Sequence, residues 1–389
     1  MLFLFNILKD SVQSELDDFF GRIEASDTRV HKVSNSAFTQ ARRKLKHSAF
    51  IELDSVQVDH FYSNTNYHKW NGFRLAAIDG STAVIPSTPE TQKKFGVSEV
   101  KKSGVAVVLA RISEAFDPLN HITLDAAIQP YKVDEGTMMI WHLEKLNKGD
   151  LALYDRNYPS FWGYKLHQKK GVHFCMRVQA KGRGKVIEDF VASGAKDMVV
   201  EISCTTDNSR NRCAELGLGT ACVKCRLLKI ELKSGETEVL VTSLLDTELF
   251  QYECFEELYH LRWPVEEDYK LLKCRLEIEN FSGKSNEAVQ QDFFAKIFMA
   301  NLTSILAFDA NIELEEKTEH RKLDYKINWS NAIGNMKKSA ALLFVRTNVD
   351  DILDSLHSLF QVQPVAIRPN RTFERFHGKN KRRFSMCYK

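Results

Sequence analysis

Long apolar runs are absent from this chain of 389 residues. A membrane-spanning helix needs about 20 apolar residues in succession, and no run in the sequence approaches that length. Residues 1–8 are apolar, but this run is short, has no basic start and meets Asp10, which argues against a signal peptide. We therefore expect no membrane association and a cytoplasmic location.

Cysteine is too scattered for a disulfide framework. The eight cysteines are spread over the whole chain, which suits a reducing compartment. Cys222 and Cys225 form one close pair downstream of Cys204 and Cys213, and four sulfurs could hold a zinc ion. A second close pair is missing, and residues 221–232 have a strand-like pattern. The sequence thus favours buried thiols over a zinc site.

The net charge of +3 is too small to indicate a nucleic-acid partner by itself. Its distribution is more informative, because no carboxylate lies between Thr28 and Ile51. The basic residues of this segment are Arg29, Lys32, Arg42, Arg43, Lys44 and Lys46.

A helix capped by Ser34 or Ser36 is predicted in this basic segment. Ala37, Ala41 and Leu45 recur at four-residue intervals and would form its buried face. The other positions carry the side chains predicted to contact DNA phosphates, which are Arg42, Arg43, Lys44 and Lys46. A basic helix that only aids solubility is the alternative.

Four polar residues share one side of a predicted helix farther along the chain. At 100° per residue, Tyr259, Arg262, Glu266 and Lys273 fall within an arc of about 60°, beside an apolar stripe. Pro264 either kinks this helix or begins a new one, because proline lacks an N–H and clashes with the preceding turn. The pattern fits either a solvated helix with charge pairs or a metal-binding carboxylate flanked by cations for phosphate.

Upstream, the expected order is strand, strand, strand, helix, strand, at 73–79, 104–112, 121–128, 134–146 and 150–154. This is the order of an RNase H-like core, in the α/β (α+β) class. It places Asp79 at the end of the first, central strand and Asp155 after the fourth, and these strands are neighbours in that fold. One strand-end aspartate alone would be read as a turn former or helix cap. Two of them, with Glu266 downstream, favour a catalytic site.

The spacing Tyr259-x2-Arg262-x3-Glu266-x6-Lys273 resembles the signature of the IS4 family of bacterial cut-and-paste transposases, a branch of the DDE transposases. The elements Asp79-Gly-Ser and Asp155-Arg-x-Tyr158 are also similar to family elements. Residues 36–45 are similar to the family's N-terminal DNA-binding region. The resemblance covers nearly the whole chain.

The resemblance implies a domain organisation in five segments. They are a helical N-terminal DNA-binding domain (1–65), the first part of an RNase H-like catalytic core (66–178), a β-rich insertion domain (179–246), the second part of the core with the glutamate-bearing helix (247–320), and a C-terminal helical region with a basic tail (321–389).

The resemblance also implies an activity and its partners. We expect metal-dependent cleavage of transposon ends through a hairpin intermediate, followed by strand transfer into target DNA. Asp79, Asp155 and Glu266 would hold two Mg²⁺ or Mn²⁺ ions, while Tyr259, Arg262 and Lys273 would contact DNA. The expected partners are double-stranded DNA, as terminal inverted repeats and target, and a second copy of the chain in a synaptic dimer. The expected location is the bacterial cytoplasm, at the nucleoid.

Two other functions stay open at this stage: a catalytically inactive DNA-binding protein derived from a transposase, and a metal-dependent nuclease on the same fold. The chain also departs from some relatives, which carry a tryptophan on the insertion that stacks on a flipped base. No tryptophan occurs between Trp162 and Trp263, so Phe250 or Tyr252 would have to replace it.

Overall fold

The structure is a computed structural model that describes the chain except residues 7–9, 100–105, 183, 232–236 and 369–389. The described residues form two compact units, which we treat separately. Unit 1 comprises Met1–Thr65, Thr82–Ala110 and Asp268–Lys389, and unit 2 comprises Asn66–Ser81 and Arg111–Glu267. The predicted DNA contact of the basic tail lies outside the described residues.

The helices are η1 (Leu2–Asn6), α1 (Val12–Ile23), α2 (Asn35–Arg42), α3 (Ser48–Asn64), α4 (Pro89–Phe95), α5 (Glu135–Lys145), α6 (Phe161–Lys170), α7 (Lys185–Ala192), α8 (Asp207–Glu215), α9 (Cys254–His260), α10 (Pro264–Cys274), α11 (Asn286–Thr318), α12 (Trp329–Leu343) and α13 (Val349–Phe360). The strands are β1 (Leu75–Ile85), β2 (Val97–Glu99), β3 (Ala106–Asp117), β4 (Ile122–Pro130), β5 (Leu151–Tyr154), β6 (His173–Val178), β7 (Asp197–Ile202), β8 (Val223–Glu231), β9 (Thr237–Thr242), β10 (Tyr325–Lys326) and β11 (Val365–Ala366).

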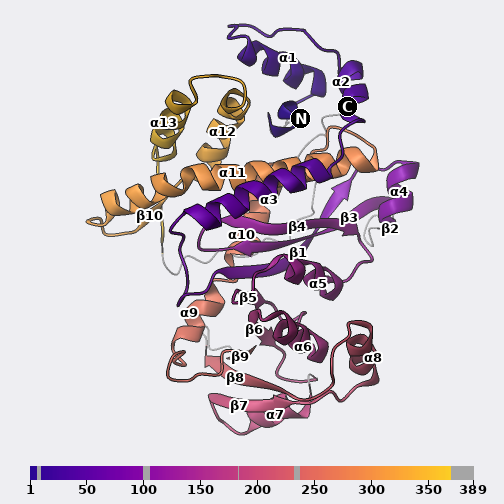
Figure 1. Ribbon diagram of the computed structural model, residues 1–389, viewed down its shortest axis with the longest axis vertical. Helices are drawn as coiled ribbons and strands as arrows, with labels where there is room; N and C mark the ends of the chain where they lie inside the picture. Colours follow the sequence, from indigo (N-terminus) through magenta and orange to yellow (C-terminus); the bar gives the residue numbers. More distant parts are fainter. Residues whose placement is uncertain (7–9, 100–105, 183, 232–236, 369–389) are drawn as a thin grey trace. The chain divides into compact units, whose positions relative to one another are not determined.

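The central sheet confirms the RNase H-like prediction. In the described part of the chain its order is β2-β3-β1-β5-β6-β9-β8-β7, and β4 pairs with β3 (Figure 1). Taking β1, β3, β4, β5 and β6 as the first to fifth core strands gives the order 3-2-1-4-5. β5 lies parallel to both β1 and β6. All four residues of β5 are buried, as expected for a parallel strand covered on both faces.

The core of unit 2 forms between this sheet and two amphipathic helices. Met139 and Leu143 of α5 join Tyr164 of α6 in one apolar cluster with Ala152 and Phe174 of the sheet. α5 lies in the segment predicted as helix and has Asp134 as its N-cap, whose side chain accepts a hydrogen bond from the Thr137 N–H. The two helices thus cover the strands that carry Asp79 and Asp155.

The predicted β-rich insertion continues the core sheet. β9 pairs antiparallel with β6, from Cys175 opposite Thr242 to Val178 opposite Val239, and β8 and β7 follow outward. Two helices, α7 and α8, lie in the same segment. Hydrogen bonding along β6 therefore joins the insertion to the catalytic core. Cys213 and Cys225 are buried there, and Cys222 is exposed.

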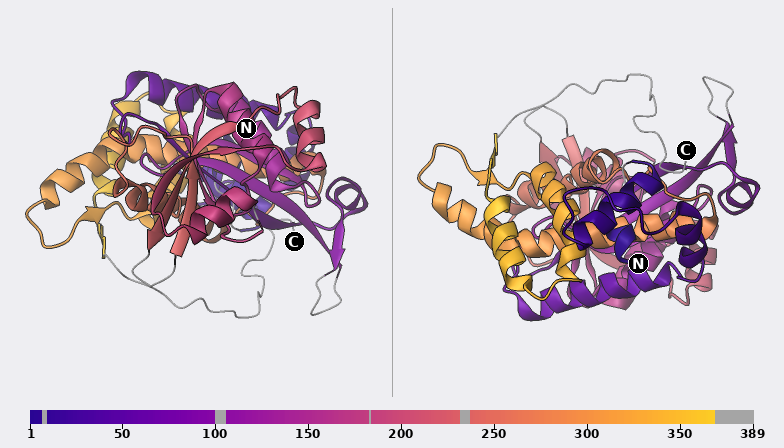
Figure 2. Two further views of the ribbon diagram at one scale, coloured as in Figure 1. Left: turned by 90° about the horizontal axis from the view of Figure 1, so that it is seen from below. Right: turned by 90° about the horizontal axis from the view of Figure 1, so that it is seen from above.

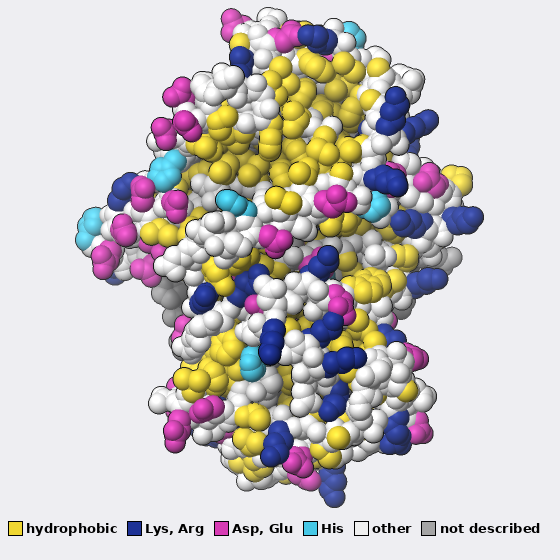
Figure 3. Space-filling model, in the orientation of Figure 1, with side chains coloured by type: hydrophobic (Ala, Val, Ile, Leu, Met, Phe, Trp, Pro, Cys, Tyr) yellow, Lys and Arg dark blue, Asp and Glu magenta, His cyan; other side chains and the backbone are white. Residues whose placement is uncertain are grey.

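Unit 1 is organised around α11. This helix is long and apolar enough to cross a membrane by composition, but 72% of its most apolar window is buried inside the protein, as in the core helix of a soluble protein. η1, α3, α12 and α13 lie against it in Figure 2, and α1 packs on η1 and α12. The rings of Phe5 and Phe298 stack at 4.4 Å between centroids. Figure 3 shows hydrophobic side chains on the same part of the surface, and Phe344 at the end of α12 is 49% exposed.

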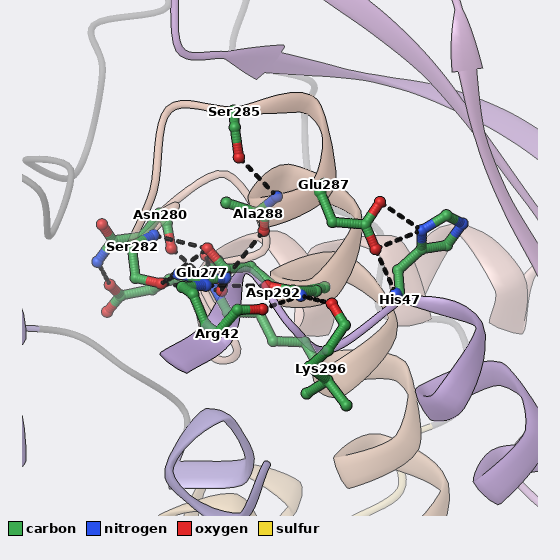
Figure 4. A network of polar contacts seen from close by, with 12 residues as sticks. Arg42, His47, Glu277, Asn280, Ser282, Ser285, Glu287, Ala288, Asp292 and Lys296 are labelled. Atoms are coloured by element: carbon green, nitrogen blue, oxygen red, sulfur yellow. Dashed lines mark hydrogen bonds and ion pairs between the residues drawn. The ribbon is translucent and has the colours of Figure 1, made fainter. Parts of the chain in front are cut away.

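Arg42 is the polar centre of unit 1 (Figure 4). Its guanidinium forms an ion pair with Asp292 at 2.9 Å and donates to Gln291 Oε1 at 2.9 Å, Ser282 Oγ at 2.7 Å and the Ala288 carbonyl at 3.2 Å. The residue is 6% exposed. The prediction that Arg42 binds DNA is therefore contradicted, because every contact of its charged group described here is made inside the fold.

Other expectations for the N-terminal segment also fail. α2 begins after Ser34, one of the two predicted caps, but ends at Arg42. Ala37 and Ala41 are exposed, so the buried face is not the alanine stripe. Residues 1–65 group with α11 in unit 1, where Arg42 and Phe5 pack on that helix. Polar contacts continue along α11, where Glu287 accepts from the backbone N–H of His47.

Arg42→Met should destabilise the protein by about 3–5 kcal/mol, because it leaves Asp292 buried without its counter-charge. Urea denaturation of the purified protein measures the change. Arg43→Ala is the matched control, since Arg43 is exposed, and should alter stability by less than about 0.5 kcal/mol. Adding Asp292→Leu to Arg42→Met should restore part of the loss. A stable Arg42→Met protein would contradict this account.

Candidate active site

The pairing of β1 with β5 brings two carboxylates together. The strands are parallel, with Ile78 opposite Tyr154, so Asp79 and Asp155 are the next residues on neighbouring strands. β5 ends at Tyr154, and Asp155 begins a turn in which its Oδ1 accepts from the Asn157 N–H at 2.8 Å. Both aspartates therefore lie on one edge of unit 2, next to each other.

Asp79 stands inside its strand and not at the predicted strand end. β1 continues to Ile85, so the Asp-Gly-Ser-Thr sequence is strand and the predicted turn is wrong. Asp79 Oδ1 accepts from the Gly80 N–H at 2.8 Å, and its backbone carbonyl accepts from Ser113 Oγ at 3.0 Å. The carboxylate is thus held by its own strand, and the Asp79 backbone is held by β3.

Asp79 has a raised carboxyl pKa, and the causes of this shift show which charged groups lie near it. Its carboxyl pKa is raised from 3.8 to about 6, mainly by burial and to a smaller extent by the charges of Asp155 and Glu266. The Gly80 hydrogen bond and the Arg262 guanidinium act in the opposite direction. All three predicted carboxylates are therefore within electrostatic range of one another, and Arg262 is the cation that offsets them.

Glu266 comes from the start of α10. α9 ends at His260, residues 261–263 form a turn, and α10 begins with Pro264, so the restarting helix is the correct alternative. The single continuous arc is therefore wrong, but the turn still brings Arg262 Nη2 within 2.9 Å of Glu266 Oε1. The arginine side chain is 6% exposed and the glutamate 31%. The carboxylate of this ion pair is therefore more exposed to solvent than the guanidinium.

Tyr259 has a different contact from the predicted one. It is buried, and its hydroxyl donates to the backbone carbonyl of Tyr154 at 3.3 Å. Tyr154 directly precedes Asp155, and its own hydroxyl pairs with His167 Nε2 at 2.9 Å inside the core. Tyr259 thus ties α9 to the end of β5, next to a catalytic candidate.

The remaining predicted residues lie in segments assigned to unit 1. Lys273 is half-buried in the last turn of α10, in the segment assigned to unit 1. Arg43, Lys44 and Lys46 are exposed in unit 1, just beyond α2.

A buried polar chain behind Asp79 was not predicted. His142 Nδ1 lies 2.7 Å from Asp125 Oδ2, and its Nε2 lies 2.8 Å from Ser113 Oγ, the hydroxyl that contacts the Asp79 carbonyl. His142 and Ser113 are both fully buried. Four elements, β1, β3, β4 and α5, meet through this chain. Their sequence spacing carries no signal, because the contact depends on the strand order.

A fourth carboxylate, Glu135, also went unnoticed in the sequence. It is the first residue of α5 and pairs with Arg111 of β3 at 2.9 Å. Burial raises its pKa, and the Asp155 charge adds to this, while Arg111 opposes both. The signal in the sequence is its place at the start of the helix predicted at 134–146, directly after the third predicted strand.

The three predicted carboxylates suit a hard divalent cation by their chemistry, because Mg²⁺ prefers oxygen ligands. The raised pKa of Asp79 reflects its burial first and the charges of Asp155 and Glu266 second, and a bound cation would offset both effects. Among the described residues, no three His, Cys, Asp or Glu side chains lie close enough to hold one ion as they stand. Donor type and charge therefore fit a metal, and binding it would require the carboxylates to draw closer.

Comparisons with known proteins give a family match and two similar proteins. The sequence model of the family described as "Transposase DDE domain" matches residues 70–302. The chain is 23% identical over 349 residues to the transposase InsG for insertion sequence element IS4 of Escherichia coli (strain K12), covering 88% of this chain and 76% of that protein. A piggyBac transposase synaptic complex with hairpin DNA aligns at a TM-score of 0.40 and 8% identity, over 74% of this chain and 57% of that one.

Asp79→Asn should stabilise the metal-free protein above pH 6 by on the order of 2 kcal/mol. The folded-state pKa of Asp79 is raised to about 6, so the folded protein keeps this proton up to that pH. The contribution of this proton to the free energy of unfolding is therefore fully present below the pKa of Asp79 in the unfolded chain. It is lost as the pH rises through the pKa of Asp79 in the folded protein. The measurement is urea denaturation in EDTA at pH 4, 5 and 8.

The stability difference between Asp79→Asn and the wild type should be large at pH 8 and vanish near pH 4. Asp27→Asn, at an exposed aspartate, is the control and should show no such dependence. An Asp79→Asn variant that is no more stable than the wild type at pH 8 would contradict the burial argument.

Proposed function

The chain belongs to the transposase DDE domain family and is therefore a DNA transposase, and on that premise we propose how it works. It cleaves the ends of a mobile DNA element and joins them to target DNA, with Asp79, Asp155 and Glu266 as the catalytic carboxylates. The observation that carries this assignment is the register of β1 with β5, which sets two of them side by side. The charge of Glu266 raises the pKa of Asp79, as that of Asp155 does, and this links Glu266 to the same site.

The chemistry of phosphodiester cleavage explains the residue types. When Mg²⁺ or Mn²⁺ is bound to Asp79, Asp155 and Glu266, it supplies an activated nucleophile and stabilises the leaving oxygen. The side chains themselves provide oxygen ligands of fixed charge, on two strands and one helix. The buried chain of Ser113, His142 and Asp125 holds the Asp79 backbone so that its carboxylate keeps its place.

Arg262 is the residue proposed to hold the scissile phosphate. In the structure it pairs with Glu266, and its Nε is buried with no partner among the described residues. A guanidinium can offer two parallel donors to phosphate oxygens, so Arg262 is suited to take a phosphate when Glu266 binds metal. Lys273, on the helix α10 that also carries Glu266, is proposed to contact DNA. Tyr259 is assigned a positioning role, since its hydroxyl contacts the Tyr154 backbone.

Finer steps are proposed from the resemblance to the IS4 family. We propose a hairpin intermediate at the transposon end, reopened before strand transfer, and a dimer that holds two DNA ends. Arg43, Lys44 and Lys46 are exposed and remain candidates for DNA phosphate contacts. Lys and Arg side chains are also frequent on the face of unit 2 seen in the lower half of Figure 3, which suits a polyanion.

Asp79→Ala, Asp155→Ala and Glu266→Ala should each abolish cleavage of the element's ends, because each removes a ligand of the cation. Binding of the ends should stay within about threefold of wild type, since positively charged groups supply most of the affinity. Cleavage in Mg²⁺ is followed on denaturing gels and binding by fluorescence anisotropy. Substantial cutting by any variant would exclude that residue as a ligand. A wild-type protein that cuts but never joins strands would be a nuclease.

Arg262→Ala should still nick DNA but form and resolve hairpins slowly, because the cut phosphate is no longer held in position. Arg262→Lys should rescue only weakly, since an ammonium cannot make the paired contact. A time course that separates nicked, hairpin and broken DNA measures this. Arg275→Ala, at an exposed arginine just after α10, is the control. If Arg262→Ala loses the first nick as fully as Glu266→Ala, Arg262 belongs to the core chemistry.

A further inference from the structure

Glu135 is held in place from two sides. It opens α5 directly after the N-cap Asp134, and its Oε1 pairs with Arg111 Nη1 of β3 at 2.9 Å. The side chains of both partners are at least three-quarters buried, at 25% and 20% exposed. An exposed ion pair contributes little to stability, but a pair fixed between a strand and a helix start has a defined position.

Glu135 also lies directly against the strand of Asp79. A Cβ built on Gly80 would stand 3.0 Å from Glu135 Oε1, 3.2 Å from its Cγ and 3.4 Å from its Cδ. Gly80 does not have a positive φ, so its backbone conformation would accept another residue. The glycine after Asp79 is therefore explained by the space that the Glu135 side chain occupies.

The same carboxylate reaches the turn of Asp155. The Asn157 side chain lies close enough to Glu135 to lower the pKa of its carboxyl group, and the Asn157 backbone N–H donates to Asp155 Oδ1 at 2.8 Å. The Tyr158 hydroxyl is buried with no partner among the described residues, next to the carboxylates of Glu135, Asp79 and Asp155. Glu135 thus touches the residue after one catalytic aspartate and the turn of the other.

We propose that Glu135 is a positioning residue of the catalytic centre, which aligns Asp79 and Asp155 for the divalent cation through its contacts with Gly80 and Asn157. The inference rests on the proposed function, because it assumes that the two aspartates bind metal. Arg111 holds Glu135 in this position. The role depends on the shape and the acceptor oxygens of the side chain, so a glutamine should perform most of it.

The test is Mn²⁺ binding to the full-length protein without DNA, measured by electron paramagnetic resonance. Glu135→Ala should weaken binding about 10- to 100-fold, the usual effect of removing a group that orients metal ligands. Glu135→Gln should stay within about threefold of wild type. Urea denaturation of each variant confirms folding. Unchanged binding by Glu135→Ala would overturn the proposal, and so would a Glu135→Gln protein as weak as Glu135→Ala.

A double-mutant cycle tests the contact with Gly80 separately. Gly80→Ala alone should weaken Mn²⁺ binding, because the new methyl group displaces Glu135. In the Glu135→Ala background, Gly80→Ala should have no further effect, since the space is then empty. Equal effects of Gly80→Ala in both backgrounds would show that the glycine serves another purpose and would overturn this part of the argument.

Asp155→Ala distinguishes failure of this inference from failure of the proposed function. If the wild type has no Mn²⁺ site that Asp155→Ala removes, the metal-binding role of the aspartates is wrong and the positioning role falls with it. If Asp155→Ala removes the site and Glu135→Ala leaves it intact, only the positioning role is wrong.

Discussion

The parallel pairing of β1 with β5 is the constraint on which the site depends. Parallel strands with Ile78 opposite Tyr154 place the following aspartates next to each other, whatever the loops do. This arrangement destabilises the isolated protein, because Asp79 is largely buried and the carboxylates of Asp155 and Glu266 repel it. The apolar packing of α5 and α6 on the sheet offsets that cost. The protein is thus less stable because of the same carboxylates that are proposed to bind the cation.

The surrounding polar groups hold the backbone around these two aspartates in place. The Asp79 backbone is held by the chain that runs through Ser113 to His142, and the Asp155 turn is preceded by a carbonyl fixed by Tyr259. Arg262 supplies the nearby positive charge and lowers the pKa of Asp79 against the effect of burial. Each support comes from a different element, so the site depends on the whole of unit 2.

Arg42 shows the limits of charge counting. In the sequence it is one of several basic residues without acidic neighbours, and it does not differ from Arg43 beside it. In the fold one arginine is buried with Asp292 on α11, and the next is exposed. A buried arginine needs an acid and several acceptors, and all of these lie about 250 residues away in the chain. No local pattern contains that information.

Local patterns did determine the order of the core elements and the candidate carboxylates. Buried strands, the Asp134 cap and the break at Pro264 all follow from properties of a few neighbouring residues. The family-like spacings singled out Asp79, Asp155 and Glu266, whose catalytic role remains a prediction. Only the tertiary structure decided that β7 to β9 extend the core sheet, that Tyr259 contacts backbone, and that Glu135 lies over Gly80. The reason is physical: these features are contacts between segments far apart in the chain, and they exist only once the strands have paired and the helices have packed on them.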